Sequence, residues 1–197
     1  MRAGNFDFAI SSSTSRRLAD SLITMKLKTT MSFLSILGLS AFAKADPLAV
    51  GAAAPEISAV DQDGKTVNFK DVFAKGPTLV YFYPKADTPG CTKQGCSIRD
   101  GWSDLKAKGI QVLGVSEDKP DAQKKFQEKY KLPHTLIADN DGKVAKAFAV
   151  DMIPIAGLTK RQSFLIKDGK VVWNMLAAST ETHAADVIKA FDALPKN

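Results

Sequence analysis

From residue 57 onwards, hydrophobic and polar positions follow two alternating patterns. Short continuous runs of apolar and β-branched residues predict buried strands, and longer amphipathic stretches predict helices. The expected strands cover residues 78–83, 110–115 and 135–138, and the expected helices cover 91–108, 120–130, 143–148 and 182–194. Strands that alternate with helices in this way indicate an α/β domain.

Two hairpins are expected at the ends of this alternation. Residues 57–60 and 66–69 flank the turn-forming cluster 61–64, and residues 162–166 and 170–173 flank the Lys-Asp-Gly turn at 167–169. An N-terminal β-hairpin, strands interleaved with helices and a late hairpin together predict a three-layer sandwich with a central mixed sheet flanked by helices. This arrangement resembles the thioredoxin fold. We expect one such domain over residues 46–197, because this part has no internal repeat, low-complexity tract or linker.

The preceding segment is typical of a secretory signal peptide. Met25 opens a short basic stretch, residues 31–42 are apolar, and Ala43-Lys44-Ala45 fits an A-x-A cleavage site, so we expect a signal peptide over 25–45. The apolar run is shorter than the roughly 18 residues of a membrane span. Any membrane contact is therefore expected only during export, to the periplasm or the exterior.

Residues 1–24 then precede a complete leader. We expect an over-long start assignment or a disordered extension, with Met25 as the true initiator. Two alternatives remain, a twin-arginine signal at Arg16-Arg17 and an organelle transit peptide rich in Ser and Arg. Asp20 counts against both.

Composition narrows the functional classes. The 197 residues are 45% hydrophobic and 24% charged, which is typical of a folded globular protein. Of the formal charge of +6, most lies in residues 1–45, and the remainder has 21 basic and 19 acidic residues without a basic stripe. Nucleic-acid binding is therefore not expected. With only two cysteines, a disulfide-dense scaffold and a four-cysteine zinc ribbon are excluded.

The candidate chemistry lies between residues 83 and 96. Cys91 follows a strand and a Pro-Gly turn and opens a helix, where free N–H groups and the helix dipole favour a thiolate. Cys96 lies five residues further on, about 8.7 Å away between Cα atoms in an ideal helix, beyond the ~7 Å limit for a disulfide. A disulfide would therefore require the helix to unwind, and Gly95, a poor helix former, would make that easier.

Other uses of the two cysteines are less favoured. A static disulfide usually closes a longer loop than six residues, because a longer loop gives more stabilisation. A zinc site of Cys91, Cys96, His134 and His183 lacks a local ligand motif around either histidine. We therefore expect a redox-active pair, with no metal and no cofactor.

The chain resembles the peroxiredoxin family. Pro84-x-x-x-Thr88-x-x-Cys91 matches the P-x-x-x-T/S-x-x-C motif of that family, and a cysteine five residues after the first marks the bacterioferritin-comigratory-protein or Q-type subgroup, which is atypical 2-Cys. The resemblance runs from about Val50 to the C-terminal helix and includes residues 81–85, 114–116 and 161–166.

This resemblance implies a thiol-dependent peroxidase that reduces hydrogen peroxide and organic hydroperoxides in antioxidant defence. It implies that Cys91 is the peroxidatic cysteine and Cys96 the resolving cysteine. Thr88 would hydrogen-bond thiolate and peroxide, Arg161 would stabilise negative charge, and Pro84 would shield the sulfur. A thioredoxin-like protein would reduce the resulting disulfide, and a monomer would suffice.

Several residues also have simpler interpretations. Arg161 could be a solvated cation and Thr88 a helix cap. Lys85 and Asp87 are expected to be solvated loop residues and His134 to have no role. Core positions are expected for four aromatic residues: Phe82, Tyr83, Trp102 and Trp173.

The rival function is an exported thioredoxin-like copper-binding chaperone or thiol–disulfide oxidoreductase. These classes use C-x-x-x-C with a distant histidine and C-x-x-C, respectively. The pair here is C-x-x-x-x-C, and the threonine and arginine of the peroxiredoxin pattern are present.

Overall fold

The computed structural model describes residues 47–195. The signal peptide expected over 25–45 and the start or extension expected over 1–24 lie outside this range. Within it, no helix combines the length and the apolar character that a membrane crossing requires.

A seven-stranded mixed sheet forms the centre of the domain, with strand order β2-β1-β5-β4-β3-β8-β9. Strands β3, β4 and β5 are parallel, and the remaining neighbours in the sheet are antiparallel. A separate pair, β6 and β7, is also antiparallel. The strand bounds are β1 Ser58–Asp61, β2 Thr66–Asn68, β3 Thr78–Phe82, β4 Gln111–Ser116, β5 Thr135–Ala138, β6 Met152–Ile153, β7 Leu158–Thr159, β8 Ser163–Lys167 and β9 Lys170–Met175.

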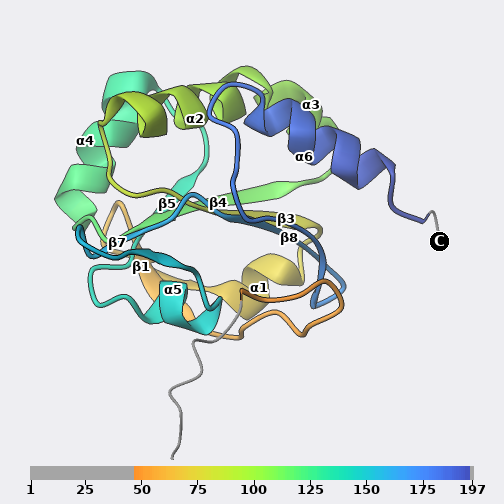
Figure 1. The fold of residues 1–197 in the computed structure, drawn as a ribbon. Helices are drawn as coiled ribbons and strands as arrows, with labels where there is room; N and C mark the ends of the chain where they lie inside the picture. Colours follow the sequence, from red (N-terminus) through yellow and green to blue (C-terminus); the bar gives the residue numbers. More distant parts are fainter. Residues whose placement is uncertain (1–46, 196–197) are drawn as a thin grey trace, which may run out of the picture. The chain divides into compact units, whose positions relative to one another are not determined.

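Helices cover both faces of the sheet (Figure 1). Helices α2, α3, α4 and α6 lie over one face, and the short helices α1 and α5 lie over the other. The helix bounds are α1 Phe69–Phe73, α2 Pro89–Asp100, α3 Trp102–Ala107, α4 Pro120–Tyr130, α5 Lys143–Ala147 and α6 His183–Asp192. The three-layer sandwich, its mixed sheet and both hairpins are confirmed.

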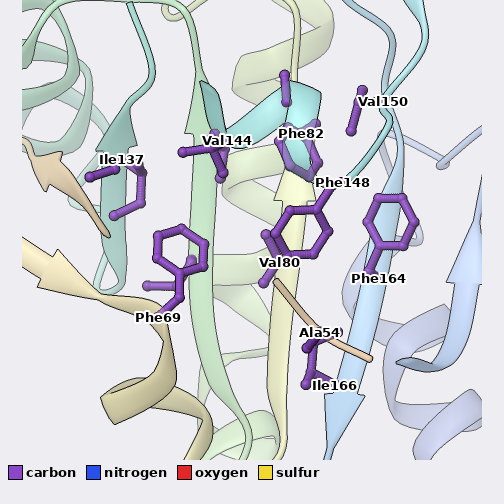
Figure 2. Packing of buried hydrophobic residues seen from close by; sticks show 14 of the residues in the cluster. Ala54, Phe69, Val80, Phe82, Ile137, Val144, Phe148, Val150, Phe164 and Ile166 are labelled. Atoms are coloured by element: carbon purple, nitrogen blue, oxygen red, sulfur yellow. The ribbon is translucent and has the colours of Figure 1, made fainter. Parts of the chain in front are cut away.

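Strand β3 shows why a continuous apolar run becomes the central strand. All five of its residues are buried, because alternate side chains enter different hydrophobic clusters. Val80 and Phe82 join the cluster under α1 and α5, where Figure 2 shows them with Phe148 and Phe164. Leu79 and Tyr81 point to the opposite face of the sheet and join the cluster under α2, α3, α4 and α6. β3 is therefore held from both sides, which fixes the loop that follows it.

Three details differ from the expected elements. The helix expected over 91–108 is divided at Gly101 into α2 and α3. A Cβ at Gly101 would lie 2.5 Å from the Cβ of Ala184, so the close approach of α6 to this junction requires glycine. Phe69 begins helix α1 instead of ending a strand, with Asn68 as its N-cap accepting from Lys70 N. The β6–β7 pair was not expected, because two-residue strands leave no periodic pattern.

The topology places residues 83–91 and 161 together. Strand β8 runs antiparallel to β3, with Tyr81 opposite Ser163. The segment that precedes β8 therefore lies beside the segment that follows β3. Residues 70 positions apart in sequence meet at this end of the sheet.

Candidate active site

Cys91 lies in the first turn of α2, directly beyond the carboxyl end of β3. Thr88 is the N-cap and Pro89 is the first helical residue, a position where the missing N–H of proline costs nothing. The first helical hydrogen bond runs from Thr92 N to Thr88 O at 2.8 Å, so the N–H groups of Gly90 and Cys91 precede the helical ladder. Cys91 is a free thiol with 3% exposure. Its sulfur thus lies, almost wholly buried, at the positive end of a helix dipole.

Arg161 places a positive charge beside the sulfur. Its Nη2 lies 3.5 Å from Cys91 Sγ, within reach of a hydrogen bond to sulfur. A Cβ on Gly90 would lie 3.2 Å from the same Nη2, so the backbone of Gly90 closes one side of the guanidinium. A half-buried cation at this position favours negative charge on the sulfur and on any oxygen bound next to it.

Gln94 holds the other side of the guanidinium, a contact that the sequence analysis did not foresee. Arg161 Nη1 donates to Gln94 Oε1. Gln94 is fully buried one helical turn after Cys91 and lies 3.1 Å from His183 Nδ1 through its Nε2. Arg161 is therefore held by a buried amide and is not the solvated cation of the alternative interpretation.

Thr88 and Pro84 lie in the segment that leads from β3 to Cys91. The Thr88 hydroxyl donates to the carbonyl of Lys85 at 2.9 Å, so its oxygen can accept a hydrogen bond from a peroxide O–H, but its hydrogen already has an acceptor. Thr88 thus occupies the N-cap position expected of a helix cap, but its side chain makes no capping bond. Pro84 is half-buried directly after Tyr83.

The loop between Pro84 and Thr88 is tied at two points. Ala86 N donates to Asp118 Oδ2 at 2.7 Å. The Asp87 carboxylate accepts from Lys129 Nζ at 2.8 Å and from the Tyr130 hydroxyl at 2.6 Å. The lysine contact, followed by the tyrosine contact, lowers the pKa of Asp87. Asp87 is exposed, as expected of a solvated loop residue, and it also attaches the loop to α4.

Cys96 lies in the same helix and is a half-buried free thiol. With both cysteines inside continuous α2, helix geometry keeps their Cα atoms about 8.7 Å apart. Gly95 has a role beyond weak helix propensity, because a Cβ there would lie 3.3 Å from Leu132 Cδ1 and 3.5 Å from Phe126 Cζ. Arg99 Nη1 donates to Tyr130 O at 3.0 Å. The second half of α2 is thus packed against and fastened to α4.

Neither histidine accompanies the cysteines as a metal ligand. His134 Nε2 lies 2.7 Å from the Tyr81 hydroxyl, and His183 bonds to Gln94 and Ser163. Within residues 47–195, no three His, Cys, Asp or Glu side chains form a group that could hold a metal ion. The four-residue zinc arrangement is therefore not assembled.

Comparison with known proteins identifies the family. The model of the AhpC/TSA family matches residues 50–174, more than half of the chain. The chain belongs to the AhpC/TSA family of peroxiredoxins.

Sequence relatives of this peroxiredoxin carry Q-type and Bcp names, which confirms the subgroup resemblance. It is 40% identical over 134 residues to chloroplastic peroxiredoxin Q of Gentiana triflora, covering 68% of this chain and 60% of that protein. It is 50% identical over 105 residues to peroxiredoxin Bcp of Escherichia coli, covering 53% of this chain and 67% of that protein. The chain thus matches about two thirds or less of the length of these relatives.

Solved structures agree with the peroxiredoxin fold. Peroxidoxin BcpB from Mycobacterium tuberculosis is similar with a TM-score of 0.70 and 29% identity, covering 76% of this chain and 99% of that one. The bacterioferritin comigratory protein of Xanthomonas campestris is similar with a TM-score of 0.67 and 26% identity, covering 75% and 98%. The copper-chaperone and oxidoreductase rival is not favoured.

Of the residues from sequence analysis, Arg161 and Cys91 come into contact, and Thr88 is the N-cap of the helix that carries Cys91. Pro84 lies in the loop before that helix. Cys96 lies on the same helix but out of bonding distance. Sequence reasoning missed Gln94 and His183, which are 89 positions apart. A polar residue on the inner face of α2, three positions after Cys91, was the only available signal for Gln94.

Proposed function

We propose that this peroxiredoxin is a thiol-dependent peroxidase in which Cys91 is the peroxidatic cysteine. The Cys91 thiolate attacks the terminal oxygen of a peroxide ROOH, an S–O bond forms and the O–O bond breaks. The sulfur becomes a sulfenic acid, and the departing alkoxide takes up the proton that the thiol released, giving an alcohol or water.

The contact between Arg161 Nη2 and Cys91 Sγ is the observation that carries this proposal. In the transition state, negative charge moves from sulfur to the departing oxygen. Donors that are already in place stabilise that charge without reorganisation. Arg161 and the first N–H groups of α2 are such donors, and the Thr88 oxygen can accept from the O–H of the incoming peroxide.

Cys96 is the resolving cysteine in this proposal. After α2 unwinds, the Cys96 thiol displaces water from the sulfenic acid of Cys91 and forms the Cys91–Cys96 disulfide. A thioredoxin-like dithiol protein then reduces the disulfide and is itself oxidised. Because both cysteines belong to one helix, the cycle needs no second chain, and we infer that a monomer suffices.

The proposed substrates are hydrogen peroxide and organic hydroperoxides, in keeping with a role in antioxidant defence. The similar X. campestris structure is titled for the alkyl peroxide reduction activity of that protein. No metal or cofactor enters the reaction as written, since sulfur alone carries the electrons.

The decisive experiment measures peroxide consumption and intact mass of the reduced full chain in parallel. Wild type should consume one equivalent rapidly and form an internal disulfide. Cys96→Ser should react but stop at the sulfenic acid or its further oxidation products, and Cys91→Ser should be inert. If wild type reacts no faster than a free thiol and instead binds copper stoichiometrically through its cysteines, the rival function is correct.

We also propose that residues 1–45 direct the protein to a compartment. Export with cleavage after Ala45 remains the prediction from the leader pattern. The Gentiana and rice relatives are named chloroplastic, which supports the organelle alternative. The mass of the mature protein from its native cell, together with cell fractionation, separates the two. An N-terminus at or near Asp46 in the periplasm or medium supports export, and one in an organelle supports import.

A further inference from the structure

A continuous chain of polar side chains leads from Cys91 into the core. Arg161 contacts Cys91 Sγ through Nη2 and Gln94 Oε1 through Nη1. Gln94 Nε2 lies 3.1 Å from His183 Nδ1, and His183 Nε2 lies 2.9 Å from Ser163 Oγ. The last three residues are each 0% exposed. Such a chain is isolated from solvent, so each link depends on its neighbours.

The direction of every hydrogen bond in this chain follows from the guanidinium. Arg161 can only donate, so the carbonyl oxygen of the Gln94 amide must face it. The amide nitrogen then faces His183 and donates, so Nδ1 must carry a lone pair and the ring proton lies on Nε2. Nε2–H in turn donates to the hydroxyl oxygen of Ser163. One tautomer of His183 is compatible with this arrangement.

The surroundings of His183 favour the neutral ring that this tautomer requires. Burial lowers the pKa of His183 to about 4, Asp186 on its own helix opposes the shift, and the charge of Arg161 adds to it. The Tyr81 ring meets His183 edge-on at 5.5 Å between centroids. Beyond Tyr81 lies His134, whose pKa burial lowers to about 3.

We propose that His183 is a positioning residue for peroxide reduction. As the Nε2–H tautomer, it holds the Gln94 amide with its oxygen towards Arg161 and thereby fixes the guanidinium beside Cys91 Sγ. A reversed amide would present its NH2 group to the guanidinium, two donors would face each other, and Arg161 would move away. This inference rests on the proposed function, because Arg161 must act on the reacting sulfur.

A purely structural role for His183 predicts something different. His183 is completely buried in the layer between the sheet and α2, so any smaller side chain there leaves a cavity and lowers the free energy of unfolding. Such a loss would follow the volume of the side chain. The positioning role instead depends on whether an acceptor remains near the place of Nδ1.

The test compares His183→Leu with His183→Asn in the full-length protein. The Oδ1 of asparagine reaches the region of Nδ1 and can accept from Gln94, whereas leucine cannot. We expect His183→Leu to lower the second-order rate constant with hydrogen peroxide by about tenfold or more, and His183→Asn to recover it to within about threefold of wild type. Urea unfolding of each variant measures the stability cost separately.

A double-mutant cycle sharpens the result. If His183 acts through Gln94, the variant that combines Gln94→Leu with His183→Leu should react no more slowly than Gln94→Leu alone. Should His183→Leu fail to fold, Ser163→Ala replaces it, because it removes the acceptor of the Nε2 proton with little change in volume. We expect that change to slow the reaction by about threefold.

An unchanged rate in His183→Leu or Ser163→Ala would overturn the inference. Equal rate losses in His183→Leu and His183→Asn that follow the stabilities of the two variants would also overturn it. Failure of the proposed function is distinct, because wild type itself would then react no faster than Cys91→Ser.

Discussion

Arg161 depends on what surrounds its guanidinium on each side. Gln94 Oε1 accepts from Nη1, Cys91 Sγ lies near Nη2, and the bare backbone of Gly90 allows that approach. An arginine free to change rotamer would lose its donor geometry each time it moved, and donors contribute to the barrier only where the charge develops. Gly90 is therefore as much a part of the site as Arg161.

Gly90→Ala tests this dependence. The added Cβ would lie 3.2 Å from Nη2, so the guanidinium must shift by a few tenths of an ångström from its position beside the sulfur. We expect the second-order rate constant with hydrogen peroxide to fall about tenfold in stopped-flow measurements, less than the 10²–10³-fold typical of complete loss of a donor. Lys93→Ala is the matched control, because it alters an exposed side chain of the same helix. Equal rates in the two variants would contradict the role of Gly90.

Sequence alone supplies part of this site, for a physical reason. Pro84, Thr88 and Cys91 follow one strand within a few residues, so local pattern and motif find them together. Arg161 was assigned only through the family resemblance, because no spacing rule joins residues 70 positions apart. His183 carries no sequence signal, since its partners come from α2 and β8 and meet only after the sheet and α6 have packed.

At the scale of elements, α2 must be both rigid and able to unwind. Its first turn positions Cys91, while a disulfide with Cys96 requires that turn to open. Two contacts with α4 hold α2 and the loop before it in the wound form seen in the structure. The Asp87 carboxylate contacts Lys129 and Tyr130, and Arg99 Nη1 contacts the carbonyl of Tyr130. Weakening the contact of Asp87 should favour the form in which the first turn of α2 is unwound.

Asp87→Asn changes this contact with little effect on the backbone. Asp87 has a φ of 58°, a conformation that asparagine also adopts. We expect the disulfide to form about two- to threefold faster after oxidation, with less overoxidation of Cys91 at high peroxide concentration, because exposed ion pairs are weak and screened. Quenched-flow samples analysed by intact mass give both quantities. Asp63→Asn is the control, because it removes the exposed ion-pair partner of Lys124, which also lies on α4. This variant should change neither the rate of disulfide formation nor the overoxidation of Cys91. An effect equal to that of Asp87→Asn would contradict the role given to Asp87.

The elements that sequence predicted well are those with long or fully buried patterns. Strand β3 and helices α4 and α6 lie close to their expected bounds. The break between α2 and α3 at Gly101 was missed because a single glycine inside a helical pattern does not by itself end a helix, and the approach of Ala184 that requires glycine there is a tertiary contact. Helix α1 was missed because its five residues are too short for a helical period to show.

At the scale of the whole domain, the layer between the sheet and the four larger helices contains two buried histidines. Tyr81 lies next to both, with ring centroids 5.6 Å from His134 and 5.5 Å from His183. The hydrophobic pattern predicted the layer but not its polar content, because a histidine in an amphipathic stretch has the same periodicity wherever its ring finally lies. Two neutral imidazoles in a core make stability depend on pH.

We predict that the domain loses stability in mild acid. Burial lowers the pKa of His134 to about 3 and of His183 to about 4, while the unfolded chain takes up both protons near pH 6.5. The stabilisation is complete above that value and is lost as the pH falls towards the folded pKa values. Each histidine lowers the free energy of unfolding by about 1.4 kcal/mol per pH unit in this window.

Two carboxyl groups oppose this trend. Burial raises the pKa of Asp139 and Glu117, so the folded state binds their protons first and gains stability as the pH falls. Both accept backbone hydrogen bonds that favour the charged carboxylate and so oppose the rise. The folded pKa values of both histidines lie below 5, so both histidines lower the stability throughout the range from pH 6.5 to 5, and we expect a net loss there. Urea unfolding at pH 7.5, 6 and 5 measures it, and His183→Asn should show about half the wild-type slope. A free energy of unfolding that stays level across this range would mean that the histidines are not held neutral in the core.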